Sequence, residues 1–332
     1  MSVPTATAPI KDLALSSFPI GRVAVTGANG FVGKALVSCI AGTGYDVVSF
    51  VRGTEVPLVV STKTKSIGNL SVTTAWLQYL QGVYAVVHLA ARVHVTNEKV
   101  QNPLDAFREI NVDATLHLAK KAALAGVRRF VFISSIGVNG AETFDTPFNV
   151  TDVAKPHSAY AVSKYEAELG LQALAADTGM EVVIIRPPLV YGPNAPGNFG
   201  SLMRWLRRGV PLPLGAIHNQ RSLVALDNLV DLIVTCITHP AAANQTFLVS
   251  DGEDVSTTEL LSRMGKAMGC PARLVPVPAS LLKLAAAIVG KGDVAQRLCG
   301  SLQVDIEKTC RLLDWHPPVT LDEGLQRAAI QG

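Results

Sequence analysis

The amino-acid sequence predicts an α/β fold: a Rossmann-like, doubly wound parallel sheet with a smaller C-terminal α/β part that binds substrate. Over the first 190 residues, short β-branched runs alternate with alanine-rich helical stretches, which is typical of a parallel sheet covered by helices on both faces. The runs are nearly all apolar, as strands buried on both faces are. A glycine-rich turn follows the first run, where such folds bind the phosphates of a dinucleotide.

Five strands and three helices are expected in this first part. The strands are Arg22–Thr26, Asp46–Val51, Val83–Leu89, Arg129–Ser134 and Glu181–Arg186, and the helices are Phe31–Ala41, Pro103–Ala125 and Ser158–Thr178. Pro103 suits the first turn of a helix, because the N–H that proline lacks would have no partner there. The stretch Thr54–Gln81 gives no clear pattern.

After Arg186 the sequence changes character. Prolines and glycines punctuate a long irregular segment, which we expect to face the substrate. Helical patterns then return, with two short strand patterns between them. The expected helices are Asp227–Thr238, Thr257–Met268 and Ala279–Val289, and the expected strands are Thr246–Val249 and Arg273–Val275.

We divide the chain into a lead-in (residues 1–20), a dinucleotide-binding domain (21–190) whose core also receives later strands and helices, and a mainly substrate-binding part (191–332). The lead-in lacks the basic start and long apolar run of a signal peptide. The apolar stretch Leu281–Val289 is too short to span a membrane and predicts a buried helix. A peripheral membrane contact is the alternative for that stretch.

Composition excludes several function classes. Hydrophobic residues make up 48% of the 332 residues and charged residues 17%, which is too apolar for a disordered chain. The net charge of +3 gives no long-range field for nucleic acid or an anionic membrane. Five cysteines without a CxxC pair and seven histidines without ligand spacing predict no metal site and a reducing compartment, the cytoplasm. No transmembrane segment is expected.

The strongest chemical signal is a glycine triplet between a predicted strand and a predicted helix. Gly27 allows the tight turn, Gly30 lets backbone N–H groups approach a pyrophosphate, and Gly33 lets the helix pack against the sheet. The remaining candidate cofactor contacts of this loop are Asn29, Phe31 and Val32. An ordinary strand-to-helix loop is the alternative, but the flanking elements favour a dinucleotide.

The end of the second strand bears on the choice of cofactor. An acidic residue there would accept hydrogen bonds from a ribose 2′-OH and repel a 2′-phosphate. The sequence instead has Ser49-Phe50-Val51-Arg52, and the Arg52 guanidinium suits a 2′-phosphate. We therefore expect NADP(H) in preference to NAD(H), with a solvent-facing arginine as the alternative.

A second constellation predicts acid–base chemistry. A Ser134-Ser135 pair ends a strand, and Tyr160 and Lys164 follow on a helix. Their spacing of four places the phenol and the ammonium on one helical face, where the ammonium would lower the pKa of the phenol from about 10 toward neutral pH. A tyrosine tuned in this way can serve as a general acid or base.

Together these residues resemble the extended short-chain dehydrogenase/reductases, the NAD-dependent epimerase/dehydratase group that acts on nucleotide sugars. The matching segments occur in the family order over almost the whole chain. They are TGANGFVG (26–33), HLAAR (88–92), NVDAT (111–115), SSIGVNG (134–140), YAVSK (160–164), RPPLVYGP (186–193) and LLDWHPPVTLDEGL (312–325).

The resemblance implies specific roles. Tyr160 corresponds to the catalytic tyrosine, Lys164 to the lysine that holds the nicotinamide ribose, and Ser135 to the hydroxyl that binds the reacting oxygen. Asn69 stands where the family usually has aspartate beside the adenine. The other implied cofactor contacts are Leu70, Leu89, Ala90, Ala91, Arg92, Asn111 and Pro187, and the implied contacts to the diphosphate of the substrate are Asn198 and Arg221.

Two departures from the family pattern bear on how the uridine of the substrate would be held. Leu189 occupies the place where many epimerases and dehydratases have asparagine, and the late Arg-x-Gly-Asp segment is absent around Cys299–Asp305. Dehydration is disfavoured, because Ser135 is followed by Ile136-Gly137 rather than by an acidic pair.

The finer resemblance is to bacterial 4-reductases that make UDP-N-acetylquinovosamine for surface polysaccharide. It implies transfer of hydride from NADPH to the C4 ketone of a UDP-4-keto-6-deoxy-N-acetylhexosamine, for O-antigen synthesis. The alternatives are an NAD-dependent UDP-sugar 4-epimerase and a cofactor-sensing regulator without turnover. The resemblance also implies a homodimer that packs through two long helices.

Overall fold

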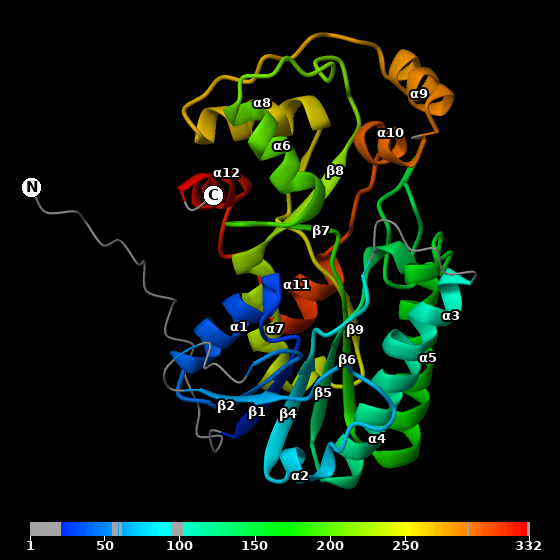
Figure 1. The fold of residues 1–332 in the computed structure, drawn as a ribbon, viewed down its shortest axis with the longest axis vertical. Helices are drawn as coiled ribbons and strands as arrows, with labels where there is room; N and C mark the ends of the chain where they lie inside the picture. Colours follow the sequence, from blue (N-terminus) through cyan, green and yellow to red (C-terminus); the bar gives the residue numbers. More distant parts are fainter. Residues whose placement is uncertain (1–20, 55–58, 60–61, 94–101, 291, 331–332) are drawn as a thin grey trace, which may run out of the picture.

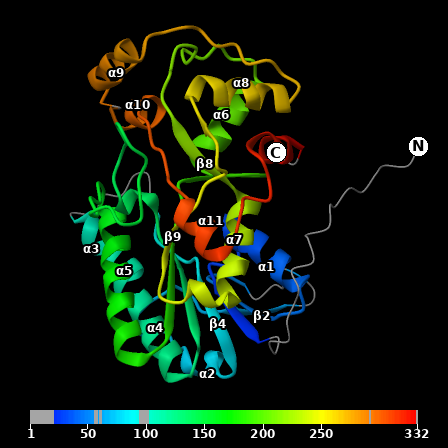
Figure 2. The same ribbon diagram turned by 180° about the vertical axis from the view of Figure 1, so that it is seen from behind.

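The structure is a computed structural model, and it describes residues 21–54, 59, 62–93, 102–290 and 292–330 (Figure 1). The predicted lead-in, residues 1–20, therefore lies outside the described residues. One large parallel sheet has helices on both faces, and a smaller part with its own sheet covers one end of it (Figures 1 and 2). The predicted fold class is confirmed.

Seven parallel strands form the large sheet in the order β3-β2-β1-β4-β5-β6-β9. The strand order reverses between β1 and β4, which is the switch point where doubly wound sheets bind their ligands. The strands are β1 (Arg22–Thr26), β2 (Asp46–Val51), β3 (Lys63–Ser66), β4 (Val83–His88), β5 (Arg129–Ile133), β6 (Glu181–Arg186) and β9 (Thr246–Leu248).

Helices cover both faces of this sheet because the strands are apolar on both. On one face, α1 and α7 pack over a core of valine, leucine and isoleucine. On the other face, α4 and α5 pack over a second core that includes Phe130, Phe132 and Trp76. The helices of this part are α1 (Phe31–Ala41), α2 (Leu77–Leu80), α3 (Pro103–Arg108), α4 (Thr115–Leu124), α5 (Ala159–Thr178), α7 (Leu226–Thr238) and α11 (Glu307–Leu313), with short 3-10 turns η2 (Ile136–Val138) and η3 (Pro240–Ala242).

The smaller part has a three-stranded sheet in the order β10-β8-β7. Its core joins side chains from both β7 and β8 to residues of α6, α8 and α12. The elements are β7 (Leu189–Tyr191), β8 (Arg221–Ala225), β10 (Asp254–Val255), α6 (Gly197–Arg207), α8 (Thr257–Ala267), α9 (Ala279–Ile288), α10 (Gly292–Cys299) and α12 (Leu321–Ile330). Phe31, at the start of α1, contacts the core clusters of both parts.

Three sequence-based predictions need correction. The expected strand Arg273–Val275 is a single bridge between Leu274 and Leu212, because only one residue of each segment is paired. The expected irregular segment after Arg186 contains β7, α6 and β8. The predicted buried helix is α9, which has no buried residue because it lies at the outer corner of the smaller part (Figure 1).

Two further segments differ from a simple pattern. The predicted helix over residues 103–125 consists of α3, the π-helix η1 (Glu109–Ala114) and α4. The stretch without a clear pattern contains β3 and α2. Its strand, Lys63–Ser66, reads as polar because it lies at the edge of the sheet and exposes two of its side chains.

Candidate active site

The glycine loop lies at the carboxyl ends of β1 and β4, next to the switch point of the sheet. Gly27 has φ of +67°, a conformation that L side chains rarely adopt. A Cβ atom on Gly27 would lie 2.7 Å from the backbone nitrogen of Ala90, and one on Gly33 would lie 2.2 Å from the carbonyl oxygen of Gly27. Both positions therefore require glycine, as the sequence predicted for a tight turn and a close helix contact.

The first turn of α1 fits an anion. Gly30 begins the helix without a side-chain cap, and the first turn contains no acidic residue. Asn29 and Gly30 are exposed, while Phe31 and Val32 are half-buried. The first N–H groups of a helix and its dipole favour negative charge, so this turn suits the pyrophosphate of a dinucleotide.

The end of β4 forms the neighbouring wall of this loop. The N–H of Leu89 donates to the Thr26 carbonyl at 3.3 Å, and the N–H of Ala90 donates to Thr26 Oγ1 at 3.3 Å. His88 is fully buried between Thr26 Oγ1 (2.7 Å) and Thr115 Oγ1 (2.9 Å), and burial lowers the pKa of its imidazole to about 3. A neutral histidine with two hydroxyl partners is a structural residue that positions the loop.

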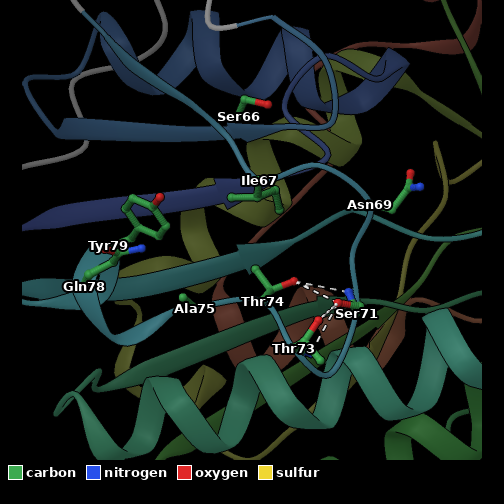
Figure 3. A pocket seen from close by; sticks show the side chains of 9 residues that line it. All are labelled: Ser66, Ile67, Asn69, Ser71, Thr73, Thr74, Ala75, Gln78 and Tyr79. Atoms are coloured by element: carbon green, nitrogen blue, oxygen red, sulfur yellow. Dashed lines mark hydrogen bonds between the residues drawn. The ribbon is translucent and has the colours of Figure 1, made fainter.

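The candidate adenine-side residues lie at the ends of β2 and β3. Arg52 is exposed directly after β2, and Asn69 is exposed after β3. Asn69 lines a polar hollow of about 330 Å³, in which the hydroxyls of Ser71, Thr73 and Thr74 bond to one another or to nearby backbone (Figure 3). The described residues that line this hollow do not include the predicted catalytic side chains, so it is separate from the acid–base site.

Ser135 and the start of α5 come together through Gly137. The Ser135 hydroxyl oxygen accepts a hydrogen bond from the Gly137 N–H at 3.1 Å, which leaves its O–H free to donate. A Cβ atom on Gly137 would lie 3.3 Å from Ser135 Oγ and 3.4 Å from the Cβ atom of Ala161, the residue after Tyr160. The structure therefore places the serine beside the first turn of the tyrosine helix.

Lys164 is deeply buried beneath Tyr160. Its Nζ donates to the Ile133 carbonyl at 2.7 Å, lies 4.3 Å from the centroid of the Phe132 ring and lies 6.0 Å from that of the Tyr160 ring. Burial lowers the pKa of Lys164 to about 7, while the charge of Glu168 raises it.

The expected acidification of the phenol is not seen in this structure. Burial raises the pKa of Tyr160 to about 12, in the opposite direction to the predicted effect of the ammonium. The physical reason is that both groups are desolvated and that Lys164 directs its hydrogen bond to the Ile133 carbonyl.

Sequence reasoning missed a buried network behind these groups. Glu168, one turn after Lys164, accepts hydrogen bonds from the Ser134 hydroxyl and from Arg186 Nε (3.0 Å) and Nη2 (2.5 Å). Arg186 Nη1 donates to Asn139 Oδ1 at 2.9 Å. Glu168 thus joins α5 to the ends of β5 and β6. The available signal was its spacing of four from Lys164, which places it on the same helical face.

Asn111 connects the cofactor side to α5. Its Oδ1 accepts from the Arg92 N–H at 2.8 Å, and its Nδ2 donates to the Arg92 carbonyl (3.1 Å) and to Ser163 Oγ (3.0 Å). It lies in the π-helix η1, an irregularity that is frequent at functional sites. Its amide is occupied by these contacts, so Asn111 joins the backbone of Arg92 to the helix of Tyr160.

The cofactor candidate Pro187 and the substrate candidates Asn198 and Arg221 come from different elements. The Pro187 carbonyl accepts from the Ile136 N–H at 3.0 Å, which places the end of β6 beside Ser135. Asn198 is exposed in the first turn of α6. Arg221 begins β8 and donates to the Gly300 carbonyl at 3.0 Å, and burial lowers the pKa of its guanidinium. Arg221 thus retains further N–H donors that suit a diphosphate.

Comparison with known proteins agrees with this geometry. Residues 23–250 match the sequence profile of the NAD dependent epimerase/dehydratase family. The chain is 47% identical over 313 residues to a UDP-glucose 4-epimerase of Vibrio cholerae, covering 92% of this chain and 94% of that protein.

Solved structures share the fold. MoeE5 in complex with UDP-glucose and NAD is 25% identical with a TM-score of 0.74, covering 93% of this chain and 97% of that one. A UDP-glucose 4-epimerase from Thermotoga maritima with UDP-glucose is 22% identical with a TM-score of 0.75, over the same shares of the two chains.

Proposed function

The chain belongs to the NAD dependent epimerase/dehydratase family, and we propose that it is a UDP-sugar 4-epimerase that uses NAD. The membership makes it a nucleotide-sugar enzyme of the extended short-chain dehydrogenase/reductase type. The observation that carries the proposal is the grouping of Ser135, Tyr160 and Lys164 at the carboxyl edge of the sheet that also carries the glycine loop. The similarity to the V. cholerae epimerase supports the choice of activity.

The glycine loop and its surroundings would hold the cofactor. The uncapped start of α1 would bind the pyrophosphate, residues 89–92 would line the phosphate and ribose side, and Lys164 would hold the nicotinamide ribose. Hydride transfer is the chemistry that the nicotinamide supplies when bound. Arg52 supports the finer proposal that the enzyme also accepts NADP(H).

The residues of the chain would manage the proton. Ser135 would donate a hydrogen bond to the oxygen at C4. Tyr160 would be deprotonated where the positive charges of Lys164 and of a bound nicotinamide offset the burial that raises its pKa, and it would then take the proton of the C4 hydroxyl as that carbon is oxidised. After the keto sugar rotates and presents its other face, Tyr160 would return the proton to the same oxygen as the carbon is reduced. Lys164 would stabilise the phenolate through the positive charge of its ammonium.

Arg221 and Asn198 would bind the diphosphate of the UDP-sugar. The guanidinium of Arg221 supports this role, because its described hydrogen bond uses Nη1 alone, toward the Gly300 carbonyl, and its planar N–H donors match phosphate oxygens. Asn198 supports it because it lies exposed at the beginning of α6.

A second candidate is the 4-keto reductase that the sequence predicted, which would form UDP-N-acetylquinovosamine or a close relative. Two observations favour it. Arg52 stands where an NAD-specific enzyme would carry an acidic residue, and Leu189 stands where many epimerases carry asparagine. A role in O-antigen synthesis belongs to this second proposal.

One experiment separates the two activities. The purified protein is incubated with UDP-glucose or UDP-N-acetylglucosamine and NAD, and the C4 epimers are measured by chromatography. Formation of the epimer without net consumption of cofactor supports the epimerase. Stoichiometric oxidation of NADPH with UDP-4-keto-6-deoxy-N-acetylglucosamine, without epimer formation from the other sugars, supports the reductase instead. Loss of neither cofactor nor substrate overturns both.

Three other predictions stay proposals. They are dimerisation through α4 and α5, a cytoplasmic location and the absence of nucleic-acid binding. Within the part of the chain that the structure describes, no helix combines the length and apolar character needed to cross a bilayer.

A further inference from the structure

Helix α9 exposes an apolar stripe to solvent. Leu281, Leu284 and Ile288 are 56%, 60% and 78% exposed, and their spacing places them along one face of the helix. Val289, directly after the helix, is 65% exposed. The outward face of a surface helix is normally polar, so a run of large aliphatic side chains there indicates a surface that another body covers.

The inner face of α9 is already in use. Ala279 and Leu282 contact the core of the smaller part, and α9 also contacts α10. The exposed stripe is therefore not the side with which this helix joins its own molecule. Figures 1 and 2 both place α9 at the outer corner of the smaller part.

We propose that α9 docks the enzyme peripherally on an anionic lipid surface. Between residues 279 and 299 the sequence has three basic residues and one acidic residue, Asp293, and of the basic residues Lys283 on α9 and Arg297 on α10 are described and exposed. Lys283 is exposed beside Leu284. Aliphatic side chains that enter the acyl boundary, with basic residues at the level of the headgroups, are the combination by which interfacial helices bind anionic membranes.

A second copy of the chain fits this surface less well. A stable interface buries about 800 Å² on each partner and is anchored by aromatic or arginine side chains. The α9 helix has ten residues, and its exposed stripe contains aliphatic side chains without an aromatic anchor. A small aliphatic face matches a flat and deformable lipid surface better than a rigid partner.

Flotation of the full chain with vesicles tests the proposal. We expect the wild-type protein to float with vesicles of phosphatidylglycerol and phosphatidylcholine, less with phosphatidylcholine alone, and less as the salt concentration rises. The double variant Leu284→Glu/Ile288→Glu should lose binding by about tenfold or more, because two aliphatic side chains that would enter the acyl region of the membrane become charged. Ile330→Glu, on α12, is the matched control, because Ile330 is 82% exposed and should tolerate the change.

Three results would overturn the proposal: absence of the wild-type protein from the floated fraction, equal loss of binding in the Ile330→Glu control, or a change from dimer to monomer in the double variant by analytical ultracentrifugation. The last would identify a second copy as the occupant. Circular dichroism checks that each variant is folded. The proposal goes beyond the epimerase activity, and flotation is measured without substrate, so either proposal can fail while the other holds.

Discussion

Helices α5 and α9 are both rich in alanine and leucine, yet α5 buries charged side chains whereas α9 leaves apolar side chains exposed. Helix α5 buries Lys164 and Glu168, which are charged residue types, against β5 and β6. Helix α9 exposes Leu284 and Ile288, which are among the most apolar. Composition alone would place the charged residues of α5 in water and the apolar residues of α9 in a core.

The difference shows that the place of a helix in the fold decides what it buries. The turns of α5 that carry Lys164 and Glu168 lie beside the carboxyl ends of β5 and β6, where the Ile133 carbonyl and Arg186 satisfy these polar groups. Helix α9 contacts the core of the smaller part through Ala279 and Leu282 and has no buried residue. Four measurements test this contrast between buried charged groups and exposed apolar groups.

The largest effect is expected from Tyr160→Phe on α5. Removing the hydroxyl removes the group that exchanges the proton at C4, so turnover with the UDP-sugar should fall by about 10²-fold to 10⁴-fold. Tyr165→Phe, on the same helix, is the matched control and should keep nearly full turnover. Equal losses in both variants would contradict the assignment of Tyr160.

The next effect concerns the buried ion pair. Glu168→Gln leaves the Arg186 charge without its carboxylate, and should lower the free energy of unfolding by about 3–5 kcal/mol in urea titration. Glu166→Gln, which breaks the more exposed pair with Arg108, should cost about 0–1 kcal/mol. Similar costs at the two positions would show that burial does not set the strength of these pairs.

Two leucines give the direct contrast between the helices. Leu171→Ala empties a fully buried site on α5 and should cost about 2–5 kcal/mol of unfolding free energy. For Leu284→Ala on α9 the free energy of unfolding should stay within about 0.5 kcal/mol of the wild type, because the exposed Leu284 side chain makes little contact with the rest of the protein. Thermal and urea unfolding of the two variants measure the difference. A large loss of unfolding free energy in Leu284→Ala would show that the Leu284 side chain is packed against other side chains.

The last measurement is the dependence of stability on pH. Burial lowers the pKa of His88 from 6.5 to about 3, so only the unfolded chain takes up this proton as the pH falls through that interval. Protonation of this histidine in the unfolded chain has no effect on stability above pH 6.5 and lowers stability progressively below that pH. His88→Gln should therefore lose less unfolding free energy than the wild type between pH 6.5 and about 3. A parallel decline in both proteins would contradict the buried neutral histidine.

The strands and glycines of the dinucleotide-binding half were predicted closely from the local sequence pattern. The five predicted strands match β1, β2, β4, β5 and β6 to within one residue, because buried parallel strands are continuous apolar runs. The glycine positions also followed, because Gly27 and Gly33 are required by backbone geometry that only glycine satisfies.

Other features of the fold and the site could not be predicted from local sequence pattern. Edge strand β3 is polar on its exposed side, and the pairing of β7 with β8 depends on residues far apart in sequence. The Glu168–Arg186 pair joins a helix to a strand, and the sequence shows only that Glu168 shares a face with Lys164. The predicted burial of α9 was wrong, because apolar character indicates where burial is favourable and does not supply the surface that covers it.

The sequence by itself determined the order of the elements, the glycine loop and the Tyr160–Lys164 spacing, because each depends on interactions between residues close in the chain. Only the tertiary structure decided which charged groups are desolvated and which apolar ones stay in water. Desolvation depends on what packs against a side chain from distant segments, and that is why it raises the pKa of Tyr160 here and leaves the stripe on α9 exposed.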